Sequence, residues 1–98
     1  KKKKKNLLLI FKTDHFKLGQ IRLEKSKNYY NLDYSISNEF RNNGFGAKMI
    51  RLAIKEYKLS KIRAVAKKKN ISSNKTLQKV GFKKISNTKT LNNYLFSL

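Results

Sequence analysis

The chain has 98 residues, enough for one domain with a single core and too few for two. It contains no cysteine, which excludes disulfide bonds and thiolate metal sites. The longest apolar run, Leu7 to Phe11, has the length of a strand and is far short of the roughly 20 residues of a membrane helix. We therefore expect a cytoplasmic protein with no bound metal and no membrane partner.

The charge is extreme: 25 basic residues face 5 acidic ones, for a formal net charge of +20. Such a field attracts any polyanion, so a basic nucleic-acid- or ribosome-associated module is one interpretation. However, 21 of the basic residues are lysine, whereas readout of phosphates and bases favours the arginine fork. Codons rich in A and T give the same bias without any function. We expect any contact with nucleic acid to rest on non-specific charge.

Three strands are expected in the first third of the chain. Leu7–Thr13 is a short apolar run, while Phe16–Glu24 and Tyr29–Ser37 alternate between apolar and polar residues. The alternation of the second strand slips at Gly19-Gln20, which predicts a β-bulge. The polar turn Lys25-Ser26-Lys27-Asn28 joins the second and third strands as a hairpin.

The apolar period then changes to that of a helix, which predicts an amphipathic helix over Phe45–Lys58. Its apolar stripe consists of Gly46, Met49, Ile50, Ala53, Ile54 and Tyr57. Alternation returns at Lys61–Lys68, the fourth strand. A short second helix follows, with its cap at Ser72 or Ser73 and its end at Gly81.

The last two strands are expected at Phe82–Ile85 and Tyr94–Leu98. The element order is then β-β-β-α-β-α-β-β, which indicates an α/β (α+β) domain with a mixed, mostly antiparallel sheet. The step from Tyr29–Ser37 through a helix to Lys61–Lys68 predicts one parallel pair.

The stretch between the third strand and the first helix carries the clearest chemistry. Arg41, Gly44 and Gly46 form an R-x-x-G-x-G pattern. Glycine permits positive φ and a close approach of a ligand to the main chain. The N–H groups at the helix start and the positive end of the helix dipole then form an anion site suited to a pyrophosphate. A plain glycine turn that caps the helix is the alternative.

This stretch resembles the acetyl-coenzyme A loop of the GNAT N-acetyltransferase superfamily, [RQ]-x-x-G-x-[GA]. In that family the strand before the loop ends in a branched aliphatic residue, and Ile36 stands five residues before Arg41. A second block resembles the family's N-x-x-[AS]-x-x-x-Y-x-K-x-G-F. It is matched by Asn70, Ser73, Lys79, Gly81 and Phe82. The resemblance covers the whole chain after the lysine run, and its two blocks occur in the family's order.

The resemblance implies an acetyl-CoA site. The Arg41–Ala47 loop would hold the pyrophosphate, and main-chain groups at the splayed end of the third strand would bind the pantetheine arm as a pseudo-strand. Asn70 and Ser73 would flank the cofactor, although helix capping also explains Ser73. The implied cofactor-binding residues are Ile36, Ser37, Arg41, Asn42, Asn43, Gly44, Phe45, Gly46, Ala47, Asn70 and Ser73.

The chain departs from the family at its catalytic positions. Leu77 stands where many members have a tyrosine that protonates the leaving thiolate, and Tyr30 stands where many have a glutamate base. Asp33 and His15 are the candidate bases, each also explained as a solvated surface residue. A water relay to a main-chain carbonyl is a further alternative, and we leave the base unassigned.

The segments Gly19-Gln20-Ile21-Arg22 and Asp33-Tyr34-Ser35-Ile36 look like those of acetyltransferase domains in nucleotide-sugar pathways of the pseudaminic-acid type. The resemblance implies transfer of acetyl to a primary amine of a small molecule, such as an amino-sugar nucleotide, by direct attack in a ternary complex. Gln20 and Arg22 would then contact the acceptor; alternatively, they are polar residues on a solvated strand face. A catalytically degenerate fold that binds CoA without turnover remains open.

Family members begin with a strand and two helices that wall the acceptor site, and only five lysines and Asn6 precede Leu7 here. We therefore expect a disordered basic tail at Lys1–Lys5 and an N-terminally truncated acetyl-CoA-binding domain at residues 6–98. The oligomeric state is not predicted.

Overall fold

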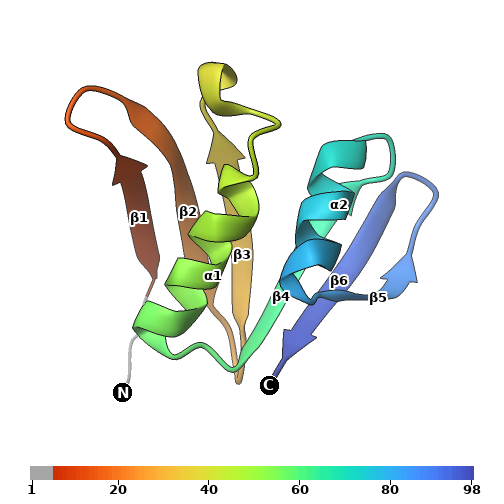
Figure 1. The fold of residues 1–98 in the computed structure, drawn as a ribbon. Coiled ribbons are helices and arrows are strands. Elements are labelled where there is room, and N and C mark those ends of the chain that lie inside the picture. Colours follow the sequence, from red (N-terminus) through yellow and green to blue (C-terminus); the bar gives the residue numbers. More distant parts are fainter. Residues whose placement is uncertain (1–5) are drawn as a thin grey trace.

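Residues 6–98 are described by a computed structural model, and the expected tail at Lys1–Lys5 lies outside them. Six strands form one sheet in the order β1-β2-β3-β4-β6-β5, and two helices and a short 3-10 turn complete the chain (Figure 1). The elements are β1 (Leu7–Lys12), β2 (Lys17–Lys25), β3 (Tyr30–Ile36), η1 (Asn38–Phe40), α1 (Phe45–Tyr57), β4 (Lys61–Lys67), α2 (Ile71–Val80), β5 (Lys83–Asn87) and β6 (Leu91–Ser97). This confirms the predicted element order and the mixed α/β class.

The sheet consists of two antiparallel parts joined by one short parallel contact. Strands β1, β2 and β3 form an antiparallel meander, and β4, β6 and β5 form a second antiparallel unit. Between them, β3 pairs with β4 in parallel only from Tyr30–Ile62 to Leu32–Ala64. Beyond that point the two strands diverge, as Figure 1 shows. The parallel pair is as predicted.

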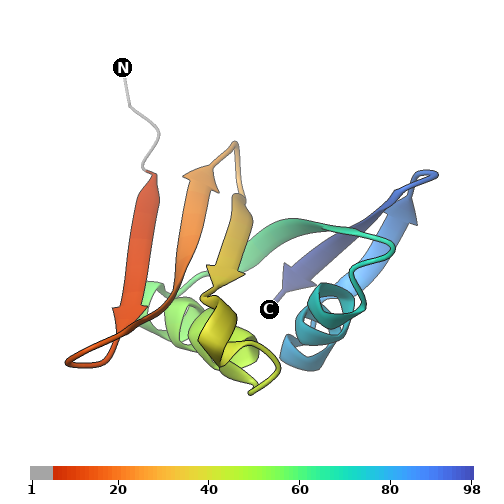
Figure 2. The ribbon, with the colours of Figure 1, turned by 90° about the horizontal axis from the view of Figure 1, so that it is seen from above.

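Both helices lie on the same face of the sheet (Figure 2). Helix α1 contacts β2 and β3, α2 contacts β4, and the two helices contact each other. The core lies between this face and the helices because alternate residues of each strand point toward them. Its fully buried side chains are Tyr94, Ile21, Leu23, Ile50, Ile62 and Leu77. The opposite face of the sheet carries no helix within residues 6–98. In the same range, neither helix has the length and hydropathy needed to cross a membrane.

Two details of the strands differ from the expectation. The register runs from Phe11↔Gly19 to Lys12↔Lys17, so the unpaired residue of the bulge is Leu18 and not Gly19-Gln20. Strand β6 begins at Leu91, three residues before the predicted start at Tyr94. The sequence did not indicate this start because the buried residue at the second position of the strand is polar, Asn92. A buried asparagine interrupts the apolar alternation from which the strand was predicted.

The apolar stripe of α1 is mostly as expected, since Gly46, Met49, Ile50 and Ala53 are buried. Tyr57, predicted on the core face, is instead 44% exposed. The residue sits at the last position of the helix, where the main chain turns away at Lys58 with a φ of 52°.

The cap of α2 also differs from the expectation. Asn70 is the N-cap, and its side-chain Oδ1 accepts a hydrogen bond from Ser73 N at 3.1 Å. Ser72 and Ser73 therefore lie within the first turn, where hydroxyls are free to serve other partners. The C-terminal end is as predicted: Gly81 has a φ of 122°, and its N–H donates to Leu77 O and Gln78 O.

Replacement of Asn70 by alanine should lower the free energy of unfolding by about 1 kcal/mol, because the Ser73 N–H loses its side-chain acceptor. Urea denaturation measures the change. Ser72→Ala is the matched control and should stay within about 0.5 kcal/mol of the parent protein, since Ser72 is exposed. Equal losses for both variants would contradict the assignment of the cap.

Gly19→Ala should destabilise the domain by roughly 1–3 kcal/mol. Gly19 is buried on β2, and an added Cβ would collide with the main-chain O of Ser35 and press on Met49 Sδ. Ser35→Ala, on the facing strand, changes an exposed side chain and should be nearly neutral. Gly19→Ala with unchanged stability in the same assay would show that the two strands can separate here without cost.

Candidate functional site

The gap between β3 and β4 is the main irregularity of the sheet. Pairing ends at Leu32 and Ala64, although β3 continues to Ile36 and β4 to Lys67. Over this length each strand is bonded only on its outer side, to β2 and to β6. Main-chain groups on the facing edges therefore lack a strand partner and need another one. One is already used: the Nε of Arg41 donates to Ile36 O at 3.2 Å.

The loop into α1 exposes main-chain donors beside this gap. Gly44 is the N-cap with a φ of 78°, and Asn42 also has a positive φ of 64°. The first N–H that serves the helix is that of Lys48, which donates to Gly44 O at 3.3 Å. Within residues 6–98, no acceptor is bonded to the N–H groups of residues 42–47. They lie at the positive end of the helix dipole and form the anion site that the glycine pattern predicts.

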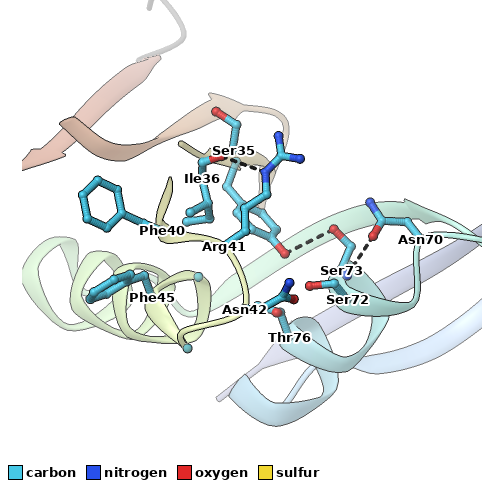
Figure 3. Close-up of a pocket in the computed structure, with 13 residues that line it drawn as sticks. Ser35, Ile36, Phe40, Arg41, Asn42, Phe45, Asn70, Ser72, Ser73 and Thr76 are labelled. Carbon is cyan, nitrogen blue, oxygen red and sulfur yellow. Dashed lines mark hydrogen bonds between the residues drawn. The ribbon is translucent and has the colours of Figure 1, made fainter. Parts of the chain in front are cut away.

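A cavity of about 440 Å³ lies where the loop, the gap and the start of α2 meet (Figure 3). Its walls come from the end of β3, the loop before α1 and the first turns of both helices. The lining residues are Tyr34, Ser35, Ile36, Phe40, Arg41, Asn42, Gly44, Phe45, Gly46, Asn70, Ser72, Ser73 and Thr76.

Most of the residues implied to bind a cofactor come together here. Those that line the cavity are Ile36, Arg41, Asn42, Gly44, Phe45, Gly46, Asn70 and Ser73. Three others do not line it. Ala47 is 3% exposed on the buried face of α1, Ser37 Oγ donates to Lys17 O at 2.7 Å, and Asn43 Nδ2 donates to Arg41 O at 3.2 Å. The last two bonds hold the ends of the loop in place.

Glycine is required at Gly44 and at Gly46 for different structural reasons. A Cβ on Gly44 would meet nothing within 4 Å, so this glycine is explained by its φ and by the open space before it. A Cβ on Gly46 would stand 3.2 Å from both Tyr34 Cε2 and Thr76 Cγ2. Gly46 thus allows α1, β3 and α2 to approach one another at the wall of the cavity.

Five lining residues were not predicted: Tyr34, Ser35, Phe40, Ser72 and Thr76. The alternation of Tyr34 with Leu32 and Ile36 predicts a residue on the core face, and its ring does pack against the core. The hydroxyl oxygens of Tyr34 and Ser73 are 3.2 Å apart, which places a phenol in the cavity. Its position two residues before Ile36 was the available signal, since residues near the splayed end of a strand lie beside the opening that the sheet leaves there.

A row of aromatic rings connects the β1–β2 turn to this loop. Ring centroids are 6.3 Å apart for His15–Phe16, 6.0 Å for Phe16–Phe40 and 5.9 Å for Phe40–Phe45. Phe40 and Phe45 line the cavity, whereas His15 is exposed in the turn and does not. The row braces the loop from the side opposite α2.

The other candidate residues lie away from the cavity. Asp33 is exposed and occupies the helix-free face of the sheet, where it stands across from Arg22 of β2. Gln20 lies on the same face and accepts a bond from Lys17 Nζ at 2.8 Å. Leu77 is 1% exposed and belongs to the core. No proposed base lines the cavity, and within residues 6–98 no cluster of three or more potential metal ligands is present.

Solved structures show that the fold is a known one. An IAA acetyltransferase from Bacillus cereus superposes with a TM-score of 0.83 at 17% identity, covering 95% of this chain and 78% of its own. A spermidine N-acetyltransferase from Vibrio cholerae in complex with CoA and spermine gives a TM-score of 0.74 at 14% identity, covering 84% and 59%. A ribosomal-protein-S5-alanine acetyltransferase from Vibrio fischeri gives 0.73 at 19%, covering 86% and 56%.

The chain thus spans less than two thirds of the length of the two Vibrio enzymes. No curated protein matches significantly. The family model of the acetyltransferase (GNAT) domain, however, matches residues 1–83. The chain therefore belongs to the GNAT acetyltransferase domain family, the acyl-CoA-dependent N-acetyltransferases, whose co-substrate is acetyl-CoA.

Proposed function

We propose that this domain binds acetyl-CoA in the cavity beside the β3–β4 gap and transfers the acetyl group to a primary amine of a small molecule. The observation that carries the proposal is the unoccupied set of main-chain N–H groups at residues 42–47, placed next to unpaired strand edges. One end of such a site suits a diphosphate, and the other suits an extended chain of amides. Acetyl-CoA contains both in one molecule.

The loop supports a role in pyrophosphate binding. The first-turn N–H groups of α1 and the helix dipole favour an anion. Gly44 leaves the approach to them free, because no atom lies within 4 Å of the place where a Cβ would be. The guanidinium of Arg41 adds a positive charge at the edge of the same cavity.

The gap supports a role in binding the pantetheine arm. The amides of such an arm can bond to the free edge of β3 as an added strand would. In the present structure Arg41 Nε occupies Ile36 O. The arm would replace this bond, which would free the guanidinium for the diphosphate. The main-chain N–H of Ile36 would then polarise the thioester carbonyl and stabilise the oxyanion of the tetrahedral intermediate, since the N–H of Ser37 already donates to Leu18 O at 2.9 Å.

The acceptor amine must attack the thioester carbon in its neutral form, within a ternary complex. We assign no base, since Asp33 and His15 both lie outside the cavity. The amine would approach from the helix-free face of the sheet, where the Asp33 carboxylate stands across from Arg22 and beside the gap. An attacking amine on this side would meet solvent that can take up its proton.

The charge of the chain favours an acceptor that carries negative groups, such as an amino-sugar nucleotide. A net charge of +20 attracts a diphosphate and repels a polyamine, in contrast to the Vibrio cholerae enzyme solved with spermine. Arg22, and Gln20 beside it on the helix-free face, would contact the phosphate or hydroxyl groups of such an acceptor.

Isothermal titration with acetyl-CoA should show saturable binding at one site, and the affinity should fall only modestly between 50 and 200 mM salt. A polyanion bound through lysines alone would lose on the order of 10³-fold or more over that range. Gly44→Val should weaken acetyl-CoA binding by at least about tenfold, because a β-branched residue disfavours positive φ and blocks the N–H groups.

A double variant, Lys83→Gln with Lys84→Gln, is the matched control. It removes two exposed charges of β5, outside the cavity, and should weaken binding of poly-uridine RNA while leaving acetyl-CoA affinity within about twofold. If Gly44→Val bound acetyl-CoA as the parent does, and the lysine variant did not, the chain would be a non-specific polyanion binder.

In an assay of CoA release, an amino-sugar nucleotide should be acetylated with a kcat/KM at least about tenfold above that of spermidine at low salt. The difference should shrink at high salt because the attraction is screened. Arg22→Gln should reduce the preference, whereas Lys84→Gln should not. Equal rates for the two amines at every salt concentration would contradict the proposal that the acceptor carries negative groups. Saturable CoA binding without any turnover would identify a catalytically degenerate domain.

A further inference from the structure

We infer that the Tyr34 hydroxyl is the hydrogen-bond donor to the sulfur atom of the bound thioester and the source of the proton that the leaving thiolate takes up. The inference rests on the proposed acetyl-CoA site. It assigns a reacting role to a residue that the sequence pattern placed in the core.

Tyr34 is positioned by contacts from three elements. It lies on β3 beyond the last parallel pair with β4, and its side chain points to the face of the sheet that the helices cover. Its ring packs against Gly46 of α1 and near Thr76 of α2. Its hydroxyl oxygen is 3.2 Å from Ser73 Oγ of α2, and both residues line the cavity. The phenol therefore has a defined direction inside the cavity, beside the β3 edge that the arm of the cofactor would bind.

No other lining residue can supply this proton as readily. Among the residues that line the cavity, Arg41 is the only one with a charged side chain, and the remaining polar groups are amides and aliphatic hydroxyls. Leu77, one turn beyond Ser73, is buried in the core. A phenolic hydroxyl donates to a sulfur acceptor and gives up its proton more readily than an amide or an aliphatic hydroxyl does.

The step can be written with all atoms and electrons placed. The acceptor nitrogen forms a bond to the acetyl carbon, and the carbon–sulfur bond breaks with its electron pair on sulfur. The thiolate takes the phenolic proton of Tyr34. The resulting phenolate recovers a proton from the Ser73 hydroxyl, which is replenished by water. The neutral amine has meanwhile released one proton to solvent, which offsets the proton drawn from water, so the products are the amide and the CoA thiol with no net proton.

The test compares Tyr34→Phe with Tyr30→Phe, which removes a phenol from the same face of the same strand outside the cavity. The ligands are CoA and desulfo-CoA, which differ only in the sulfur, and binding is measured by titration at pH 9. The parent protein and Tyr30→Phe should prefer CoA by about tenfold or more, as expected for a bond to a charged acceptor. Tyr34→Phe should bind both ligands equally, with unchanged affinity for desulfo-CoA.

The thiol of bound CoA provides a second readout, since its thiolate absorbs in the ultraviolet. The thiol pKa should be about one pH unit lower in the parent complex than in the Tyr34→Phe complex. Ser73→Ala keeps the phenol but removes the hydroxyl that orients it, so the thiol pKa in its CoA complex should be intermediate. This variant also tests the inference if Tyr34→Phe does not fold.

The possible failures are distinguishable. Loss of desulfo-CoA binding in Tyr34→Phe, or an unchanged preference for CoA in that variant, would overturn the role of Tyr34 and leave the cofactor site standing. Absence of binding of both ligands to the parent protein would overturn the proposed function, and with it this inference.

Discussion

The short parallel contact between β3 and β4 is the constraint on which the site depends. Only the pairs from Tyr30–Ile62 to Leu32–Ala64 join the two parts of the sheet. A longer contact would pair the edges of both strands and close the cavity between them. A shorter one would leave the two antiparallel units held mainly by their helices. The present length keeps the sheet continuous and still leaves main-chain groups open to a ligand.

Each side of the gap is covered by its own helix, which is held to the sheet by its own contacts. Helix α1 packs on β2 and β3, while α2 is tied to β4 and β6 by Asn74. Its Nδ2 donates to Lys67 O at 3.0 Å and to Asn70 O at 2.8 Å, and its Oδ1 accepts from Asn92 and Tyr94. This partly buried network stabilises the start of α2, which forms one wall of the cavity. Asn92 Oδ1 is buried without a partner within the described chain, a cost that a buried water would offset.

Periodicity predicted the helices, the strands and the parallel pair because apolar side chains define most of this core. It failed where polar residues are inside, as at Asn92, and where an amide caps a helix instead of a neighbouring hydroxyl, as at Asn70. The loop motif predicted the phosphate side of the site because glycine and main-chain geometry are local. The role of Tyr34 was not predictable in this way, since its alternation with Leu32 predicts only packing toward the core. The cavity beside it depends on the separation of β3 from β4, which is a property of the whole sheet.

The Tyr34–Ser73 bond connects the two sides of the gap, because Tyr34 belongs to β3 and Ser73 to α2. A ligand arm that enters the gap must therefore pass this bond or replace it. Arg41 is in a similar position, since its bond to Ile36 O uses a strand edge that the arm requires. Both bonds keep polar groups satisfied in the free domain, and both groups become donors toward the ligand once it arrives. The free and the bound site would thus use the same side chains, with the ligand taking the place of internal partners.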